Sequence, residues 1–257
     1  MSRPQPDREA DVPVQRLRVR YAKRGRLRFS SHRDFQRALE RALRRAGVPT
    51  AYSGGFTPHP RVSYAGAAPT GAASEAEYLE IALAERRDPA EVRAALDRSL
   101  PDGLDVLAVV EAPAGASRLP DDLGASVWEL SLPGVAVARA TAAVEAFLAQ
   151  ESVEVERLTK KGRRRFDARS AVVTLAVERS TARSAAGAGE SCAILQLVVR
   201  HGTPAVRPDD VLAGLRVSAG LEPPSPPAVV RLAQGPLDGE TGEVADPLAY
   251  AAGRASG

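Results

Sequence analysis

The chain has 257 residues, of which 44% are hydrophobic, 26% are charged and only 4% are aromatic. This length suffices for two modest domains whose cores are built mainly from Leu, Val and Ala. The single cysteine, Cys192, excludes an intramolecular disulfide and any cysteine-based zinc or iron–sulfur cluster. We expect a cytoplasmic protein with a buried structural thiol. No apolar stretch approaches the roughly 20 residues that cross a bilayer, so no membrane segment is expected.

Charge is distributed very unevenly along the chain. The formal net charge is only +3. The segment 16–61 holds 13 Lys and Arg against two acids, Asp34 and Glu40, a net charge of +11 that leaves −8 for the rest. This asymmetry indicates an anionic partner for the N-terminal part of the chain. A solvated Arg-rich surface with nothing bound is the alternative explanation.

The first predicted element is a strand over 15–21. Apolar residues at 17, 19 and 21 alternate in it with Arg16, Arg18 and Arg20. Because successive side chains of a strand point to opposite faces, the three arginines are expected on one face.

A helix is predicted next, over 31–46. Ser31 is suited to the N-cap, Asp34 to the capping box, and Gly47 to the stop. Apolar residues recur at intervals of three and four and form the buried stripe. The opposite side carries a row of arginines spaced by four, namely Arg33, Arg37 and Arg41.

Four further elements complete the first half of the chain. Strands are predicted over 62–65, 77–84 and 104–110, and Asp88-Pro89 opens a helix over 88–100. The resulting order, β-α-β-β-α-β, is typical of a ferredoxin-like unit.

The same order is expected to recur after a linker rich in Pro, Ala and Gly. Strands are predicted over 126–132, 153–158, 170–178, 193–200 and 229–232, and helices over 137–150 and 208–219. We therefore predict an α+β protein with two tandem ferredoxin-like domains and antiparallel sheets. The predicted parts are a disordered tail 1–14, an N-terminal domain 15–112, a linker 113–125, a C-terminal domain 126–234 and a disordered tail 235–257.

The segment 52–61, Tyr-Ser-Gly-Gly-Phe-Thr-Pro-His-Pro-Arg, is an unusual loop. Gly54 and Gly55 allow a ligand to approach the backbone closely, and the prolines on either side of His59 stiffen the chain. Tyr52 and Phe56 offer stacking faces beside basic residues, an arrangement that holds single-stranded RNA. A rigid structural hairpin with buried aromatic rings is the alternative.

A second basic run lies between residues 157 and 169, where seven Lys and Arg face only Asp167. We expect it at the tip of a β-hairpin, where it could follow a phosphate backbone. A charged turn that keeps an edge strand from aggregating has the same composition.

The candidate nucleic-acid-binding residues are Arg28, His32, Arg33, Arg37, Arg41, Tyr52, Gly54, Gly55, Phe56, His59, Arg61, Lys160, Lys161 and Arg163. His32 is expected at the first turn of the basic helix. The three histidines, His32, His59 and His201, show no spacing typical of metal ligands, so neither a metal site nor a cofactor is predicted. No phosphate-binding glycine loop, dinucleotide fingerprint or nucleophile elbow is present.

Several segments resemble the radical SAM-linked protein family. They are the helix region 27–47, the loop 51–60, Pro69-Thr-Gly71, the strand start 74–78, and Lys160-Lys161-Gly162 leading to 166–169. The resemblance covers roughly residues 15–232. The family is a domain of uncharacterised function whose members are encoded beside, or fused to, a radical S-adenosylmethionine (SAM) protein.

The resemblance implies an accessory role beside a separate radical SAM enzyme encoded nearby. Such an enzyme holds its iron–sulfur cluster through several cysteines, and this chain has only one. We expect an RNA-binding or substrate-presenting protein that acts in tRNA or rRNA modification and has no catalytic activity by itself. One alternative is a metal-independent endoribonuclease with His32 or His59 as general base, in line with a fold-level likeness to the repeat-processing CRISPR endoribonucleases. The other is a protein–protein adaptor of the radical enzyme.

Overall fold

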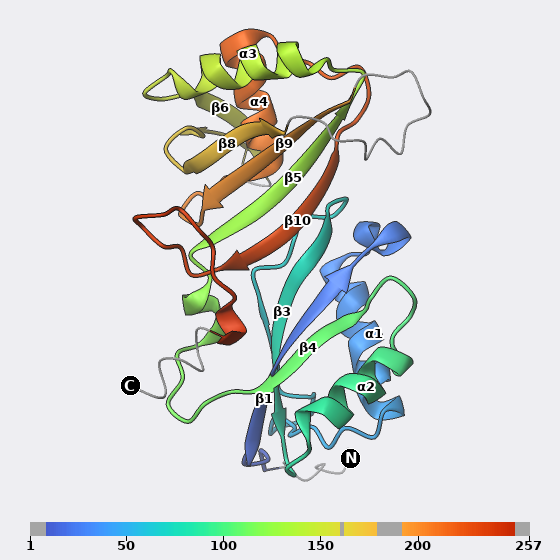
Figure 1. Ribbon diagram of the computed structural model, residues 1–257. Coiled ribbons are helices and arrows are strands. Elements are labelled where there is room, and N and C mark those ends of the chain that lie inside the picture. The colour runs from blue at the N-terminus through green and yellow to red at the C-terminus, as the bar shows by residue number, and fades with distance from the viewer. Residues whose placement is uncertain (1–8, 160–161, 179–191, 250–257) are drawn as a thin grey trace. The chain divides into compact units, whose positions relative to one another are not determined.

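The computed structural model describes residues 9–159, 162–178 and 192–249 (Figure 1). Contacts divide the chain into two compact units. Unit 1 runs to Asp122 and includes the segment from Asp246, and unit 2 is Leu123–Ala245. Each unit combines helices with antiparallel strand pairs, which confirms the predicted α+β class. No helix in the described ranges is long and apolar enough to cross a membrane.

Unit 1 contains every helix and strand that the sequence predicts for it. They are β1 (Gln15–Lys23), α1 (His32–Arg45), β2 (Val62–Ala65), β3 (Ala73–Leu83), α2 (Pro89–Ser99) and β4 (Val106–Glu111). Two short 3-10 helices, η1 (Gly25–Phe29) and η2 (Leu119–Asp122), were not predicted. The strands pair antiparallel in the order β4-β1-β3-β2. The sheet thus places β1 and β3 at its centre.

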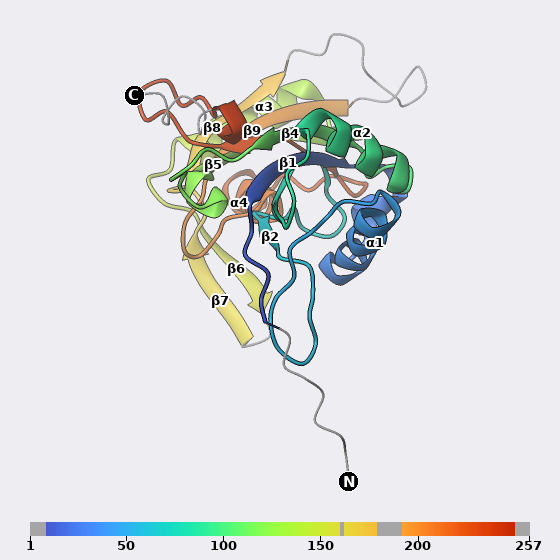
Figure 2. The same cartoon turned by 90° about the horizontal axis from the view of Figure 1, so that it is seen from below.

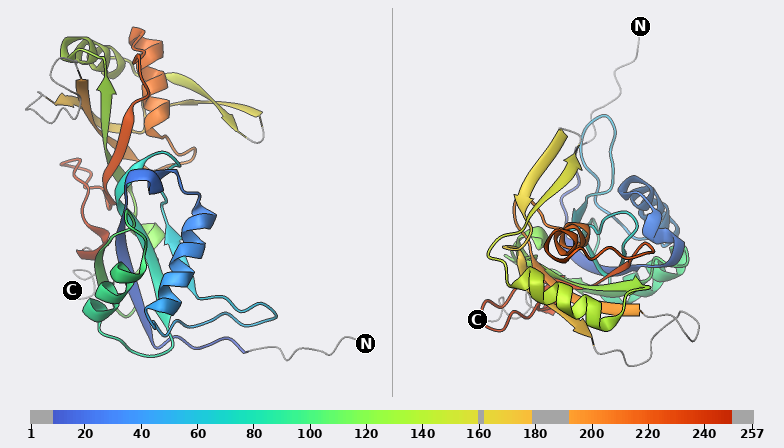
Figure 3. Two further views of the ribbon diagram at one scale, coloured as in Figure 1. Left: turned by 90° about the vertical axis from the view of Figure 1, so that its right-hand side faces the viewer. Right: turned by 90° about the horizontal axis from the view of Figure 1, so that it is seen from above.

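The core of unit 1 lies between one face of this sheet and both helices (Figure 3, left). Leu17, Val19 and Tyr21 of β1 point to this face, as the period of two predicts. The buried side of α1, including Phe35 and Leu39, packs on them together with residues of α2. α1 therefore has one anchored side and one free side.

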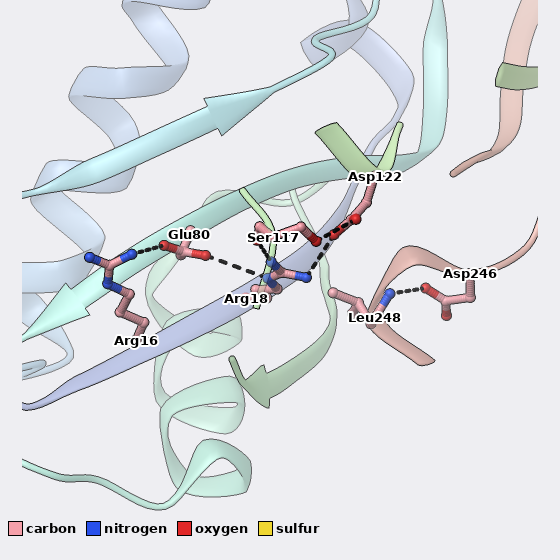
Figure 4. A network of polar contacts seen from close by, with 7 residues as sticks. All are labelled: Arg16, Arg18, Glu80, Ser117, Asp122, Asp246 and Leu248. Carbon is pink, nitrogen blue, oxygen red and sulfur yellow. Dashed lines mark hydrogen bonds and ion pairs between the residues drawn. The ribbon is translucent and has the colours of Figure 1, made fainter. Parts of the chain in front are cut away.

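The opposite face of β1 is covered by the segment that follows β4. Arg18 is fully buried on this face. Its guanidinium donates to Asp122 at 3.1 Å, to Glu80 at 3.4 Å and to the carbonyl oxygen of Ser117 (Figure 4). The predicted linker is therefore a packed part of unit 1 as far as Asp122.

Unit 2 repeats the alternation of strands and helices with one addition. Its elements are β5 (Ala125–Pro133), α3 (Val137–Leu148), β6 (Glu154–Thr159), β7 (Gly162–Asp167), β8 (Val172–Glu178), β9 (Cys192–Arg200), α4 (Pro208–Ala219) and β10 (Ala228–Gly235). Antiparallel pairs give the order β10-β5-β9-β8. β6 pairs with β7 in a separate two-stranded hairpin that projects from the rest of the unit (Figure 3, left). The sequence predicted only a turn where β7 forms.

The core of unit 2 lies between the sheet and the helices α3 and α4. Trp128 and Leu130 of β5 pair with Leu197 and Leu195 of β9, and all four are buried. Phe147 of α3 is fully buried beneath α4. Cys192, at the first position of β9, is only half-buried, so the predicted burial of its thiol is incomplete.

Part of the predicted C-terminal tail is ordered. Leu237 and Val244 form an antiparallel bridge, and Asp238 accepts backbone N–H groups in the turn between them. Beyond this turn, Leu248 is buried in unit 1. The residues 1–8 and 250–257 of the two predicted tails lie outside the described residues.

Candidate nucleic-acid interface

The arginines of β1 are paired with acids and do not form a free anion-binding face. Arg16 lies 3.5 Å from Glu80, and Arg20 lies 3.8 Å from Asp246. Arg18 is buried with its two carboxylates. Just after the strand, Arg24 binds Glu75 and Asp105. Acids from distant parts of the chain therefore neutralise this section of the +11 segment.

The free positive charge of unit 1 is concentrated on η1, α1 and the end of the following loop. Within the described ranges, the arginines of the 16–61 segment without an acidic oxygen within 4.0 Å are Arg26, Arg28, Arg33, Arg37, Arg41, Arg44, Arg45 and Arg61. All of them are exposed. This set includes every arginine that the sequence analysis proposed for unit 1.

The arginine row, Arg33, Arg37 and Arg41, lies on the exposed side of α1 because the buried stripe occupies the other side. Ser31 caps this helix: its hydroxyl accepts the N–H of Asp34 at 3.2 Å and donates to the Asp34 carboxylate at 2.7 Å. This hydrogen bond from Ser31, helped by Arg37 and Arg33, lowers the pKa of Asp34. Asp34 is thus engaged at the cap, and the row keeps a net positive charge.

Phe29, at the end of η1, presents an exposed aromatic ring beside this charge. Its exposed fraction is 59%, and the guanidinium carbon of Arg28 lies 4.6 Å from the ring centroid. The backbone is held because the carbonyl oxygen of Arg28 accepts the N–H of Gly71 at 2.8 Å. Arg28 was predicted as a binding residue and Phe29 was not, although basic and apolar residues alternate over 26–29.

His32 opens α1 and contacts an aromatic cluster. Its ring meets Tyr64 of β2 edge-on, with centroids 4.8 Å apart, and its Nε2 lies 3.1 Å from the amide nitrogen of Gln36. Tyr64 also contacts Phe35, which stacks on Tyr21. Burial, together with the charge of Glu40, raises the pKa of Tyr64 to about 12. These contacts join the N-terminal end of α1 to β2.

The loop that contains Tyr52 and His59 is a narrow hairpin that projects from unit 1 (Figure 2). Tyr52 and Pro60 form its bridge, and the Ser53 N–H donates to the His59 carbonyl at 3.0 Å. Gly55 has a φ of +93°, a conformation that favours glycine. Phe56 is 73% exposed, which contradicts the alternative of a hairpin with buried aromatic rings at this position.

Both ends of this hairpin are fixed to the N-terminal segment. Asp11 accepts the Tyr52 N–H at 2.8 Å, and its carbonyl oxygen accepts from the Arg61 guanidinium at 3.1 Å. At the His59 ring, Nδ1 lies 3.2 Å from both the Ser53 hydroxyl and the Thr57 carbonyl oxygen. The loop is therefore braced at its base and exposed at its tip.

The three histidines have separate partners. No hydrogen bond or ring contact in the described residues joins His32 to His59. His201 of unit 2 lies between the Leu123 carbonyl oxygen at 2.8 Å and the Ser126 hydroxyl at 2.5 Å, and desolvation lowers its pKa. Over the described ranges, no group of three or more His, Cys, Asp and Glu residues could hold a metal ion.

Comparison with known protein families matches this chain to an uncharacterized family. The family is described as an uncharacterized protein conserved in bacteria, DUF2344, and its match covers residues 16–208. The chain belongs to the DUF2344 family. No curated protein matches it. The matched region includes η1, α1 and the Tyr52–Pro60 hairpin in unit 1 and the β6–β7 hairpin in unit 2.

In this DUF2344 chain, the second basic run is more neutral than its composition suggests. Arg163 lies 3.1 Å from Glu156, and Arg165 contacts both Glu154 and Glu156 across the hairpin. Arg157 is bound to Asp210 at 3.2 Å. Arg164 is exposed and has no acid within 4.0 Å in the described part of the chain. Lys160 and Lys161 lie outside the described residues.

A pocket of about 670 Å³ lies on the polar face of unit 1, beneath the segment 112–120. Two of its three arginines are paired with acids, because Arg86 lies 2.7 Å from Glu111 and Arg16 lies 3.5 Å from Glu80. These carboxylates make the pocket less favourable for a polyanion than the exposed side of α1.

Proposed function

We propose that this DUF2344 chain is an accessory RNA-binding protein that presents RNA to a separate radical SAM enzyme. The single observation that carries the RNA part is the arginine row on α1. Its three guanidinium groups are exposed, and no acid within the described ranges lies within 4.0 Å of them.

The spacing of this row suits an extended polyanion. Residues four apart in a helix are separated by about 6 Å along its axis, so the row offers a guanidinium at regular intervals. Each guanidinium binds a phosphate through two parallel hydrogen bonds, and each binding event releases condensed counterions. A small anion needs only one such group, whereas a nucleic acid uses all three.

The partnership with a radical SAM enzyme is supported by the sequence resemblance. The chain has a single cysteine and therefore lacks the ligands of an iron–sulfur cluster. A division of labour follows, in which this chain holds the RNA and the partner performs the radical chemistry.

We also infer a tandem ferredoxin-like fold. In unit 1 the order β-α-β-β-α-β and the strand sequence β4-β1-β3-β2 agree with it. In unit 2 the corresponding sequence is β10-β5-β9-β8, with the β6–β7 hairpin as an insertion after the first helix.

RNA binding to the purified chain tests the proposal. Filter binding to tRNA and rRNA fragments would compare the wild type with an Arg33→Gln, Arg37→Gln, Arg41→Gln triple variant. We expect weaker binding and a slope of log K against log salt reduced by roughly 2 to 3, since each lost phosphate contact removes about 0.7–0.9.

A matched control removes the same charge elsewhere. Arg139, Arg200 and Arg216 are exposed in unit 2, and their triple Gln variant should change RNA binding much less. If both triple variants lose the same RNA-binding affinity, the effect comes from net charge alone and not from the arginine row. Binding no tighter than micromolar at low salt, unaffected by the α1 variant, would refute the proposal.

The endoribonuclease alternative has its own test. In this alternative the general base is His59, which is exposed and whose ring is restrained by the contacts of its Nδ1. Cleavage of RNA in EDTA that is lost in His32→Ala or His59→Ala would support catalysis, whereas intact RNA after long incubation would exclude it. Stable capture of the radical enzyme without RNA would favour the adaptor alternative.

A further inference from the structure

Two exposed phenylalanine rings flank α1 in the sequence. Phe29 is 59% exposed and Phe56 is 73% exposed. Phe35 of α1, by contrast, is buried in the core. Phe29 precedes the first residue of α1 by three positions, and the hairpin that carries Phe56 begins seven positions after its last residue.

Neither ring is needed to fill the core of unit 1. The buried cluster that joins both helices to the sheet includes neither of them. Exposure of a large apolar ring to water is unfavourable, so two such rings in the segment that holds the exposed arginines are more informative than scattered exposed aliphatic residues.

Each ring is held in a defined position. Arg28 covers one face of the Phe29 ring at 4.6 Å, while Gly71 lies near its edge. Phe56 stands at the tip of a hairpin braced by the Ser53–His59 hydrogen bonds and turned at Gly55. Preorganised rings lose little conformational entropy when a planar ligand stacks on them.

The arginine row lies between the two rings along the chain. α1 has 14 residues and is therefore about 21 Å long, with Arg33, Arg37 and Arg41 along its exposed side. Exposed aromatic rings and guanidinium groups are the elements with which proteins hold single-stranded nucleic acids, and one chain segment supplies both here.

We propose that Phe29 and Phe56 stack on unpaired bases of a single-stranded RNA segment whose phosphates contact the arginine row. This inference rests on the proposed RNA-binding function and adds the substrate class. A base inside a duplex keeps both faces covered by its neighbours, so only an unpaired base can stack on these rings. The favoured target is a loop or an unpaired end.

The charge around Phe29 favours RNA over a protein partner. A protein surface that covers Phe29 would also have to match Arg26, Arg28 and Arg33, all exposed and free of acids within 4.0 Å in the described chain. RNA supplies the phosphates and the planar faces in one ligand.

Fluorescence anisotropy with a labelled 12-nucleotide RNA, single-stranded or annealed to its complement, tests the inference. Phe29→Ala and Phe56→Ala should each weaken single-strand binding about 5- to 100-fold, as expected for one lost stacking contact. Duplex binding should change little. Val217→Ala in α4, another exposed apolar position, is the control and should leave the affinities for single-stranded and for duplex RNA unchanged.

Phe56→Trp gives a second, direct measurement. We expect it to bind single-stranded RNA at least as well as the wild type, and its exposed indole should be quenched on binding. The native Trp128 is buried, so its contribution to quenching should be small.

The possible outcomes separate the two proposals. If both Phe→Ala variants bind single-stranded RNA like the wild type while the arginine triple variant loses binding, stacking is refuted and the RNA-binding function stands. If no RNA binds to any variant, the proposed function itself fails. Loss of radical-enzyme capture in Phe56→Ala with unchanged RNA affinity would assign the ring to a protein partner and overturn the inference.

Discussion

Arg18 of β1 and Asp122 of η2 form an ion pair with an N···O distance of 3.1 Å, and their side chains are 1% and 5% exposed. The pair joins residues 104 positions apart in sequence. Glu80 and the Ser117 carbonyl oxygen complete the hydrogen bonds of the guanidinium. A basic residue of the N-terminal segment thus fixes the chain that leaves unit 1.

Removal of one partner should therefore destabilise the protein strongly. We expect Arg18→Met to lower the free energy of unfolding by about 3–5 kcal/mol, because it leaves Asp122 as a buried, unpaired charge. Arg16→Met in the same strand is the matched control, since Arg16 is exposed and its pair contributes about 1 kcal/mol or less. Urea denaturation measures both. Equal midpoints for the two variants would contradict the prediction.

Tyr64 should titrate at high pH. Its pKa is raised to about 12 by burial and by the charge of Glu40, compared with 10.0 for a free tyrosine. The phenol of the unfolded chain loses its proton near pH 10, whereas that of the folded chain keeps it. Unfolding is therefore increasingly favoured as the pH rises from 10 towards 12.

Ultraviolet absorbance of the phenolate measures this titration. Subtraction of a Tyr64→Phe variant isolates Tyr64 from the other four tyrosines. Glu40→Gln should lower the pKa of Tyr64 only partly, since burial is the larger cause. An unshifted titration of Tyr64 near pH 10 would show that the ring is solvated.

Gly214→Ala should destabilise unit 2 although alanine favours helices. A Cβ at this position of α4 would lie 2.6 Å from Cε2 of Phe147 in α3. Overpacking of this kind costs about 1–3 kcal/mol, which outweighs a helix-propensity gain of about 1 kcal/mol. Thermal unfolding compares it with Ser218→Ala in the same helix. Partial recovery in a Gly214→Ala, Phe147→Leu double variant is expected, and a stabilised single variant would contradict this packing.

The β6–β7 hairpin allows two neighbouring arginines to be compared. Arg163 is neutralised by Glu156, whereas Arg164 has no acid within 4.0 Å among the described residues. If the hairpin contacts RNA, Arg164→Gln should reduce the salt dependence of binding more than Arg163→Gln. Glu156→Gln should tighten binding, because it frees positive charge on the same strand pair. Filter binding with an Arg139→Gln control measures these differences, and an equal response to both substitutions would count against a contact specific to Arg164.

The helices and strands could be predicted largely from periodicity, but the residues that cover each face of the sheet could not. The period of two in β1 places Arg18 opposite the core, yet its acidic partners Glu80 and Asp122 are 62 and 104 residues away. Local patterns carry no information on such distant neighbours. The excess charge of the 16–61 segment was for this reason overestimated as a binding surface.

Local periodicity likewise predicted one part of the candidate site and not the rest. The α1 arginines followed from the helical period, because the buried stripe fixes the exposed side. Phe29 was missed because basic and apolar residues alternate over only four positions there, in a 3-10 helix of five residues. β7 was missed because its Gly-Arg-Arg-Arg-Phe-Asp sequence lacks the alternation by which strands are recognised.

The return of the chain to unit 1 at Asp246 makes unit 2 an inserted segment, attached at both of its ends. A single backbone cleavage at either junction leaves the other covalent connection intact. A fragment that ends at Asp122 would lack Leu248, which is buried in unit 1, and Asp246, which faces Arg20. Isolated expression of unit 1 therefore requires the two discontinuous pieces to be joined by a short artificial link.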